Sequence, residues 1–135
     1  MKLHYSCAMK SILGNTCVRA DRDERQIRRC REVLKQSVEE TASTARILGL
    51  VGNEVRLKIL LLINSEGRLC VCDLSDVLNM KIPAVSQHLR KLKDAGILYT
   101  EREGTVINYQ VRESACSIVE DILSLVGNDK HALSL

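Results

Sequence analysis

Six cysteines in a chain of 135 residues are the side chains best suited to chemistry, and two of them lie close together. Cys70 and Cys72 stand at the start of a short helical segment, where Cys70 occupies a place usually taken by an N-capping Ser, Thr, Asp or Asn. Unpaired backbone N–H groups and the helix dipole favour negative charge there. We therefore expect the pKa of both thiols to be lowered toward the thiolate, the form that binds metal.

Two thiolates do not complete a metal site, because Zn(II) and Cd(II) usually take four ligands, whereas softer ions accept fewer sulfurs. Candidate ligands are the three upstream thiols, Cys7, Cys17 and Cys30. The alternative is that Cys70 and Cys72 are small buried hydrophobic residues, as free cysteines often are. The number of upstream thiols favours the metal site.

The remaining cysteine and the histidines are better explained without metal chemistry. Cys116 lies near the apolar stripe of the last helical segment, which favours a place in the core or in a dimer interface. His4 and His131 are near the chain ends and are not expected to be ligands. His88 lies in a basic helical segment and is either a DNA contact or a structural histidine.

Two short helical segments follow the cysteine pair and have the proportions of a helix-turn-helix. They are predicted over 71–78 and 83–95, with a turn of four residues between them. Pro83 suits a first helical position, because its missing N–H would have no partner there and its φ already matches a helix. Gly96 ends the second segment.

The second segment carries the candidate DNA-binding side chains. Between Lys81 and Lys93 there are four basic residues and no acidic residue, which predicts a phosphate-facing surface; a solvated helix face is the alternative. Because Gln can pair with adenine, Arg with guanine and Ser with either, base contacts are expected from Ser86, Gln87 and Arg90. Phosphate contacts are expected from Lys81, Lys91 and Lys93. The same pattern predicts burial of Val85, Leu89 and Leu92.

The remaining segments predict a mainly α fold with a β-hairpin wing, which together make a winged helix-turn-helix. Arg102 in the wing is a further candidate for DNA contact, since wings tend to lie along DNA. Helices rich in Leu and Ile at both ends of the chain favour a homodimer. The expected elements are one helix or two joined helices over 21–50, a helix between Asn53 and Gly67 with its second half buried on all sides, strands over 97–102 and 105–111, and a helix over 113–126.

Length and composition are consistent with one domain. Residues 1–20 are interpreted as a mobile arm with Cys7 and Cys17, residues 21–127 as the winged domain with dimerising first and last helices, and residues 128–135 as a tail. No stretch approaches the roughly 20 apolar residues that span a bilayer, and no signal peptide is recognisable, so a cytoplasmic protein without a membrane partner is expected. A net charge of +3 supports a nucleic-acid partner only weakly.

Three segments together resemble the ArsR/SmtB family of metal-responsive repressors, and within it the CadC-like branch. They run from Leu69 to Leu74, from Val85 to Gly96, and from Arg102 to Tyr109. The resemblance covers roughly residues 45–126. It implies a homodimer that binds operator DNA without metal and releases it when metal binds. It also implies that arm cysteines, Cys17 first and Cys7 next, complete the Cys70 and Cys72 pair, often from the other subunit.

The chain departs from that family pattern in its spacing of thiols. Nine residues separate Cys7 from Cys17, and Cys30 is an additional thiol, so a three-sulfur site of Cys70, Cys72 and Cys30 suited to Hg(II), Pb(II) or As(III) is an alternative. Ser75 stands where arsenic-sensing relatives can carry a third cysteine, which disfavours As(III) by that route. The last helix lacks the histidines of zinc-sensing relatives. Cd, Pb or Hg is therefore the expected effector, ahead of Zn or As.

The sequence thus predicts a repressor of double-stranded operator DNA that responds to a thiophilic metal ion. An alternative is a repressor of the same fold that senses oxidants or persulfides, since low-pKa thiols are also redox-reactive. A third is a metal buffer or chaperone. An enzyme is not expected, because the sequence offers no paired nucleophile and base, phosphate loop or catalytic acid pair.

Overall fold

The computed structural model describes residues 19–127. The predicted ligands Cys7 and Cys17, the histidines near the chain ends and the predicted tail lie outside those residues. Within them, no helix is long and apolar enough to cross a membrane. The chain divides into two compact units, Met1–Thr41 and Ala42–Leu135.

The first unit is built around α1 (Glu24–Gln36). The carboxylate of Asp23 caps the first turn of this helix by accepting a hydrogen bond from a backbone N–H. The helix ends at Ser37, whose backbone N–H and hydroxyl both donate hydrogen bonds back to carbonyl groups of the last turn. Because α2 (Val38–Val51) begins immediately afterwards, the segment predicted over 21–50 is two helices rather than one.

The second unit is held together by aliphatic side chains around α3 (Glu54–Glu66). As predicted, Asn53 caps this helix and Gly67 ends it with a positive φ of 88°. The prediction that its second half is buried on all sides is wrong for Leu61, which is 40% exposed. This helix presents only one face to the core. The buried residues of the core are Val51, Ile59, Leu60, Ile63, Leu74, Val85, Leu89, Leu92, Ile97, Leu98, Ala115, Val119 and Leu123.

The helix-turn-helix consists of α4 (Val71–Leu78) and α5 (Ile82–Asp94), within about one residue of the predicted bounds. Two side chains shape the turn between them. Asn79 adopts a left-handed conformation with a φ of 52°, which Asn tolerates better than most residues. The hydroxyl of Ser75 donates to the carbonyl oxygen of Met80 at 2.5 Å. The position interpreted as a missing arsenic ligand therefore has a structural role in closing the turn.

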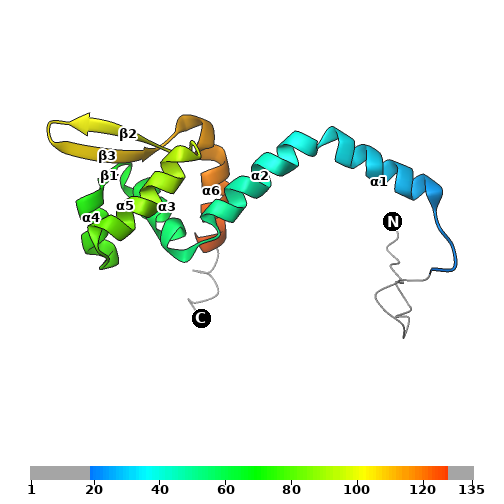
Figure 1. Cartoon of the computed structure of the whole chain (residues 1–135), viewed down its shortest axis with the longest axis horizontal. Coiled ribbons are helices and arrows are strands. Elements are labelled where there is room, and N and C mark those ends of the chain that lie inside the picture. The colour runs from blue at the N-terminus through cyan, green and yellow to red at the C-terminus, as the bar shows by residue number, and fades with distance from the viewer. Residues whose placement is uncertain (1–18, 128–135) are drawn as a thin grey trace. The chain divides into compact units, whose positions relative to one another are not determined.

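The wing is the antiparallel hairpin of β2 (Leu98–Glu103) and β3 (Val106–Val111), as predicted. A third strand, β1 (Leu69–Cys70), pairs with the other edge of β3 and gives the sheet order β1-β3-β2. A strand of two residues is too short to show a periodic pattern, so the sequence did not predict it. Figure 1 shows this sheet beside the cluster of α3, α4 and α5.

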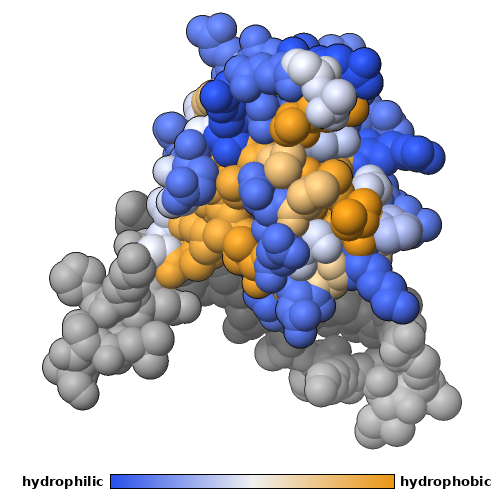
Figure 2. Space-filling view, turned by 90° about the vertical axis from the view of Figure 1, so that its left-hand side faces the viewer, coloured by the Kyte–Doolittle hydropathy of each residue, from blue (hydrophilic) through white to orange (hydrophobic). Residues whose placement is uncertain are grey.

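The last element, α6 (Glu113–Gly127), packs part of its surface into the same core. Its other side stays exposed, and Leu125 keeps 68% of its surface accessible. Figure 2 shows a further gathering of hydrophobic side chains within a largely hydrophilic face of the molecule. The described residues therefore leave apolar surface uncovered.

Candidate functional site

Cys70 links two structural elements. Cys70 is the last residue of β1, where it pairs with Asn108 of β3, and it is also the N-cap of α4. The Cys70 sulfur accepts a hydrogen bond from the backbone N–H of Asp73 at 3.5 Å, which confirms the predicted capping role. Cys70 is half-buried and Cys72 is exposed. The cysteine pair thus lies where the sheet that carries the wing joins the first helix of the helix-turn-helix.

The expectation of a lowered pKa is wrong for Cys70. Burial disfavours the charged thiolate and raises the pKa of this thiol above its ordinary value. The backbone N–H groups of Asp73 and Cys72 act in the opposite direction but are outweighed, and the Asp73 carboxylate adds to the increase. The sequence revealed the helix terminus but not the burial of this side chain in the folded chain. The raised pKa favours the protonated thiol, and binding of a metal ion has to displace that proton.

The described residues do not by themselves assemble a complete metal site. Among residues 19–127, no group of three or more His, Cys, Asp or Glu side chains is placed to hold a metal ion. Cys30 is exposed on α1, in the other compact unit. Cys116 is half-buried, its sulfur hydrogen-bonds to the carbonyl of Arg112, and it is not part of the hydrophobic core, so a place in a dimer interface stays a prediction. The ligands that join Cys70 and Cys72 stay a prediction.

The burial pattern of α5 defines which face is available to a partner. Val85, Leu89 and Leu92 are fully buried, as predicted. The opposite face is strongly basic and holds no carboxylate before Asp94. Of the predicted DNA-binding side chains, Ser86 and His88 are half-buried, and the exposed ones are Lys81, Gln87, Arg90, Lys91, Lys93 and, on β2, Arg102. This arrangement suits insertion of α5 into a groove of DNA, with Gln87 and Arg90 at the surface.

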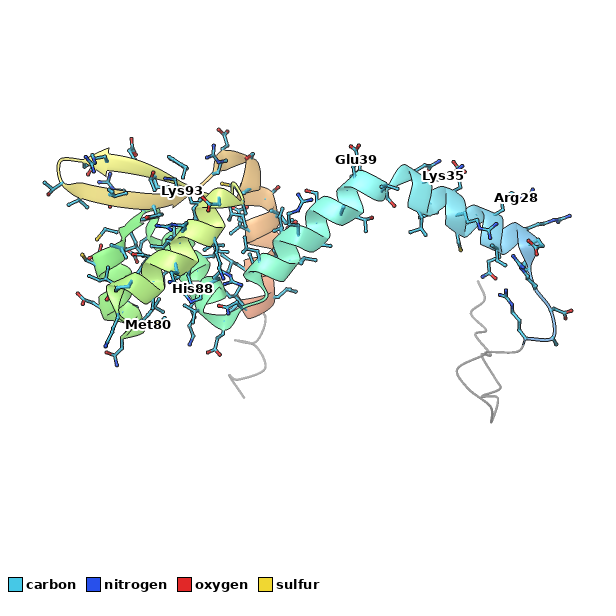
Figure 3. All side chains as sticks on the ribbon, in the orientation of Figure 1. Arg28, Lys35, Glu39, Met80, His88 and Lys93 are labelled. Atoms are coloured by element: carbon cyan, nitrogen blue, oxygen red, sulfur yellow. The ribbon has the colours of Figure 1, made fainter. Side chains whose placement is uncertain are left out.

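His88 is held by a contact that the sequence did not reveal. Nδ1 of His88 lies 3.3 Å from Nη1 of Arg56 on α3, and Nε of Arg56 donates to the carbonyl oxygen of Leu50 at the end of α2. A guanidinium can only donate, so Nδ1 of His88 is the acceptor and carries no proton. Figure 3 shows His88 and Lys93 along the same helix. Of the two interpretations of His88, this contact favours the structural one.

Burial lowers the pKa of His88 below its ordinary value, and the positive charges of Arg56 and Lys91 lower it further. We expect Arg56→Met to raise this pKa, because the substitution removes a cation next to Nδ1 while keeping a side chain of similar length. An NMR titration of the His88 ring protons measures it. Lys58→Met, on the same helix but paired with Glu54, is the matched control and should leave the pKa unchanged.

The lowered pKa of His88 also makes the free energy of unfolding depend on pH. As pH falls below about 6.5, the unfolded chain takes up a proton on His88 before the folded chain does. The free energy of unfolding should therefore decrease as the pH is lowered through this window. The decrease should be smaller in Arg56→Met than in the wild type. An equal pKa in Arg56→Met and the wild type would show that Arg56 does not contribute and that burial and Lys91 set the value.

The chain is similar to known regulators over its central part. Residues 53–100 match the family model described as bacterial regulatory protein, arsR family, a segment that runs from the cap of α3 through α4 and α5 into the wing. The uncharacterized HTH-type transcriptional regulator MJ1325 of Methanocaldococcus jannaschii is 36% identical over 89 residues, which are 66% of this chain and 97% of that protein.

Two relatives are named for resistance to metals. The arsenic resistance transcriptional regulator ArsR1 of Pseudomonas putida is 36% identical over 73 residues, 54% of this chain and 57% of that protein. The cadmium resistance transcriptional regulatory protein CadC homolog of Staphylococcus aureus is 33% identical over 67 residues, 50% of this chain and 55% of that protein. The chain thus spans little more than half the length of these two relatives.

Solved structures share the fold. The reduced HlyU from Vibrio cholerae superposes with a TM-score of 0.62 and 28% identity, over 68% of this chain and 97% of that one. The AntR antimony-specific transcriptional repressor gives a TM-score of 0.59 and 30% identity, over 69% of this chain and 85% of that one. The winged helix-turn-helix expected from the sequence is confirmed. Residues 53–100 match the family model and the 36% identity to MJ1325 extends over 97% of that regulator, so the chain belongs to the arsR family of bacterial regulatory proteins.

Proposed function

We propose that the chain is a transcriptional repressor that binds operator DNA as a homodimer and releases it when a soft metal ion is bound by cysteine thiolates. The observation that carries the proposal is the position of Cys70 and Cys72 at the junction of β1 and α4. α4 packs against α5, the helix proposed to enter the DNA groove, and β1 pairs with β3 of the wing. One pair of thiols can therefore influence both proposed DNA-contacting elements.

The mechanism begins at the cap of α4. Cys70 and Cys72 would hold the ion as thiolates, and a rotation of the Cys70 side chain toward it would break the hydrogen bond from the Asp73 N–H. Loss of a helix cap costs about 0.5–2 kcal/mol. Cys70 also lies opposite the buried Asn108, so a shift of its backbone is transmitted to β3. Both changes disfavour the orientation of α5 and the wing that fits DNA, which couples metal binding to release.

The donor set fits a thiophilic ion, because both residues at the junction supply sulfur. Cys17 and Cys7 are proposed to complete the site in the manner of CadC-like proteins, and Cys30 is the alternative third sulfur. Cd(II), Pb(II) and Hg(II) are the proposed effectors. The arsenic and cadmium resistance named in the relatives supports a metal effector in general.

A homodimer is proposed because helices near both ends of the second unit expose large apolar side chains. Leu48 on α2 keeps 49% of its surface exposed, and Leu125 and Val126 on α6 are exposed as well. Full burial of an exposed Leu or Val side chain contributes about 1.5–3 kcal/mol, so covering the part that each of these still exposes against a second copy would contribute a fraction of that amount. Residues 21–127 would then form the dimeric winged domain, flanked by the arm (1–20) and the tail (128–135).

Fluorescence anisotropy of labelled DNA from upstream of the gene tests this proposal directly. Reduced protein is titrated onto the DNA, and Cd(II), Pb(II), Hg(II), Zn(II) or As(III) is then added. We expect tight binding without metal and release by at least one of Cd, Pb and Hg. Binding unaffected by every metal but abolished by peroxide or polysulfide would instead support the redox or persulfide sensor. Failure to bind DNA at all would leave a metal buffer as the function.

A further inference from the structure

The first compact unit carries a concentration of positive charge that the proposed repressor mechanism does not use. All of the basic side chains of α1 are exposed, and Figure 3 shows two of them, Arg28 and Lys35, on this helix. The five basic residues of the helix are Arg25, Arg28, Arg29, Arg31 and Lys35. The helix itself contains only two acidic residues, Glu24 and Glu32, so its net charge is 5 − 2 = +3.

Three carboxylates in and beside α1 interact with other groups. Asp23 accepts the capping hydrogen bond from a backbone N–H, and Glu24 pairs with Arg22 at 2.8 Å. Glu32 accepts a hydrogen bond from the side-chain amide of Gln36. Within residues 19–127, no salt bridge involves any of the five α1 cations. Their charge is therefore available to a partner outside this helix.

The cations of α1 are also arranged on one side. At 100° per residue, Ile27, Cys30, Val33 and Leu34 share one arc of the helix. The five basic residues occupy the rest of the circumference together with Glu24 and Glu32, so that face of the helix is basic on balance. A helix of this kind can lay a broad basic face against a polyanion while its apolar side faces elsewhere.

Two observations favour DNA over an anionic membrane as that polyanion. Four of the five cations are arginine, whose planar guanidinium matches phosphate oxygens with two parallel hydrogen bonds. Helices that lie in membrane interfaces commonly anchor with Trp, Phe or Leu, whereas this chain has no Trp and no Phe, and α1 has a single Leu. The proposed function already brings the chain to DNA.

We propose that α1 is a second DNA-binding surface, which contacts the phosphate backbone through its arginines without reading base sequence. This inference rests on the proposed DNA binding by α5 and the wing, and extends the protein's contact with DNA beyond them. Contacts of this kind strengthen binding to any duplex long enough to reach α1, and they make that binding more sensitive to salt.

The test measures salt dependence with the full chain. Arg28→Gln/Arg29→Gln removes two cations while keeping good helix formers in α1. Affinity for a long duplex of mixed sequence is measured by anisotropy over a series of KCl concentrations. The slope of log affinity against log salt is negative, and each lost phosphate contact makes it less steep by about 0.9, so the slope of the double variant should be less steep by about 1.8. Circular dichroism and sedimentation velocity confirm that helix content and assembly match the wild type.

A charge-matched control separates a specific contact from a general loss of charge. Arg22→Gln/Lys58→Gln also removes two cations, but these already pair with Glu24 and Glu54. Its slope should stay close to that of the wild type. Equal slopes for the wild type and the Arg28→Gln/Arg29→Gln variant would overturn the proposal for α1.

Two further measurements separate DNA binding by α1 from membrane binding and from DNA binding by α5. If the α1 variant keeps its DNA slope but loses binding to phosphatidylserine vesicles, α1 is a membrane contact and the proposal fails. Arg90→Ala, measured on DNA from upstream of the gene, tests the repressor function separately. Loss of binding in Arg90→Ala together with an unchanged α1 variant would leave the repressor proposal standing and remove only the second surface.

Discussion

Replacing Cys70 with serine is expected to abolish the release of DNA by metal while leaving DNA affinity without metal nearly unchanged. Serine is among the best N-capping residues, so its hydroxyl can accept the Asp73 N–H in place of the sulfur and hold the first turn of α4. A hydroxyl does not replace a thiolate as ligand for Cd(II), Pb(II) or Hg(II). The wild type should lose affinity by about 5–150-fold on adding metal, and Cys70→Ser should lose almost none.

The same anisotropy titration gives the controls for this prediction. Cys72→Ser should behave like Cys70→Ser, since each removes one of the paired sulfurs. Cys116→Ser removes a half-buried thiol on α6 that hydrogen-bonds to a backbone carbonyl, and it should keep the full metal response. A normal metal response in both Cys70→Ser and Cys72→Ser would show that the effector binds elsewhere, and the mechanism proposed for the junction of β1 and α4 would be abandoned.

Substitutions at two adjacent residues of α5 should have different effects: one should reduce stability and the other should reduce DNA binding. Leu89 is fully buried in the core, so Leu89→Ala is expected to lower the free energy of unfolding by about 2–5 kcal/mol through lost burial and a residual cavity. A small domain has a total of only about 5–15 kcal/mol, so much of its stability would be lost. Urea denaturation followed by circular dichroism measures the change. A loss under about 1 kcal/mol would mean that the core relaxes around the smaller side chain.

Arg90 is exposed next to Leu89, and Arg90→Ala should leave the unfolding transition close to that of the wild type. If Arg90 reads a guanine, its loss removes about 1–3 kcal/mol of discrimination, a weakening of roughly 5–150-fold on the operator. Binding to DNA of unrelated sequence should change much less. Equal losses on both DNAs would identify Arg90 as a phosphate contact, in the group with Lys91 and Lys93.

The sequence alone determined the helices of the second unit, the two strands of the wing and the order of these elements. Pro83 and Gly96 marked the bounds of α5, and Asn53 and Gly67 marked those of α3, because caps and breakers act through local backbone geometry. Burial of Val85, Leu89 and Leu92 followed from helical periodicity alone. The family could also be recognised, since its distinguishing residues lie in short continuous segments of the helix-turn-helix and wing.

The tertiary structure decided what depends on neighbours distant in the chain. β1 exists because β3, almost 40 residues later, offers an edge with which Leu69 and Cys70 can pair. Burial of Cys70, set by that fold, raises its pKa although its place at a helix terminus predicted the reverse. His88 likewise depends on Arg56, 32 residues away. Local signals in the sequence determine helix ends and turns. Desolvation and side-chain partners are properties of the folded chain, and these determine the pKa values of Cys70 and His88.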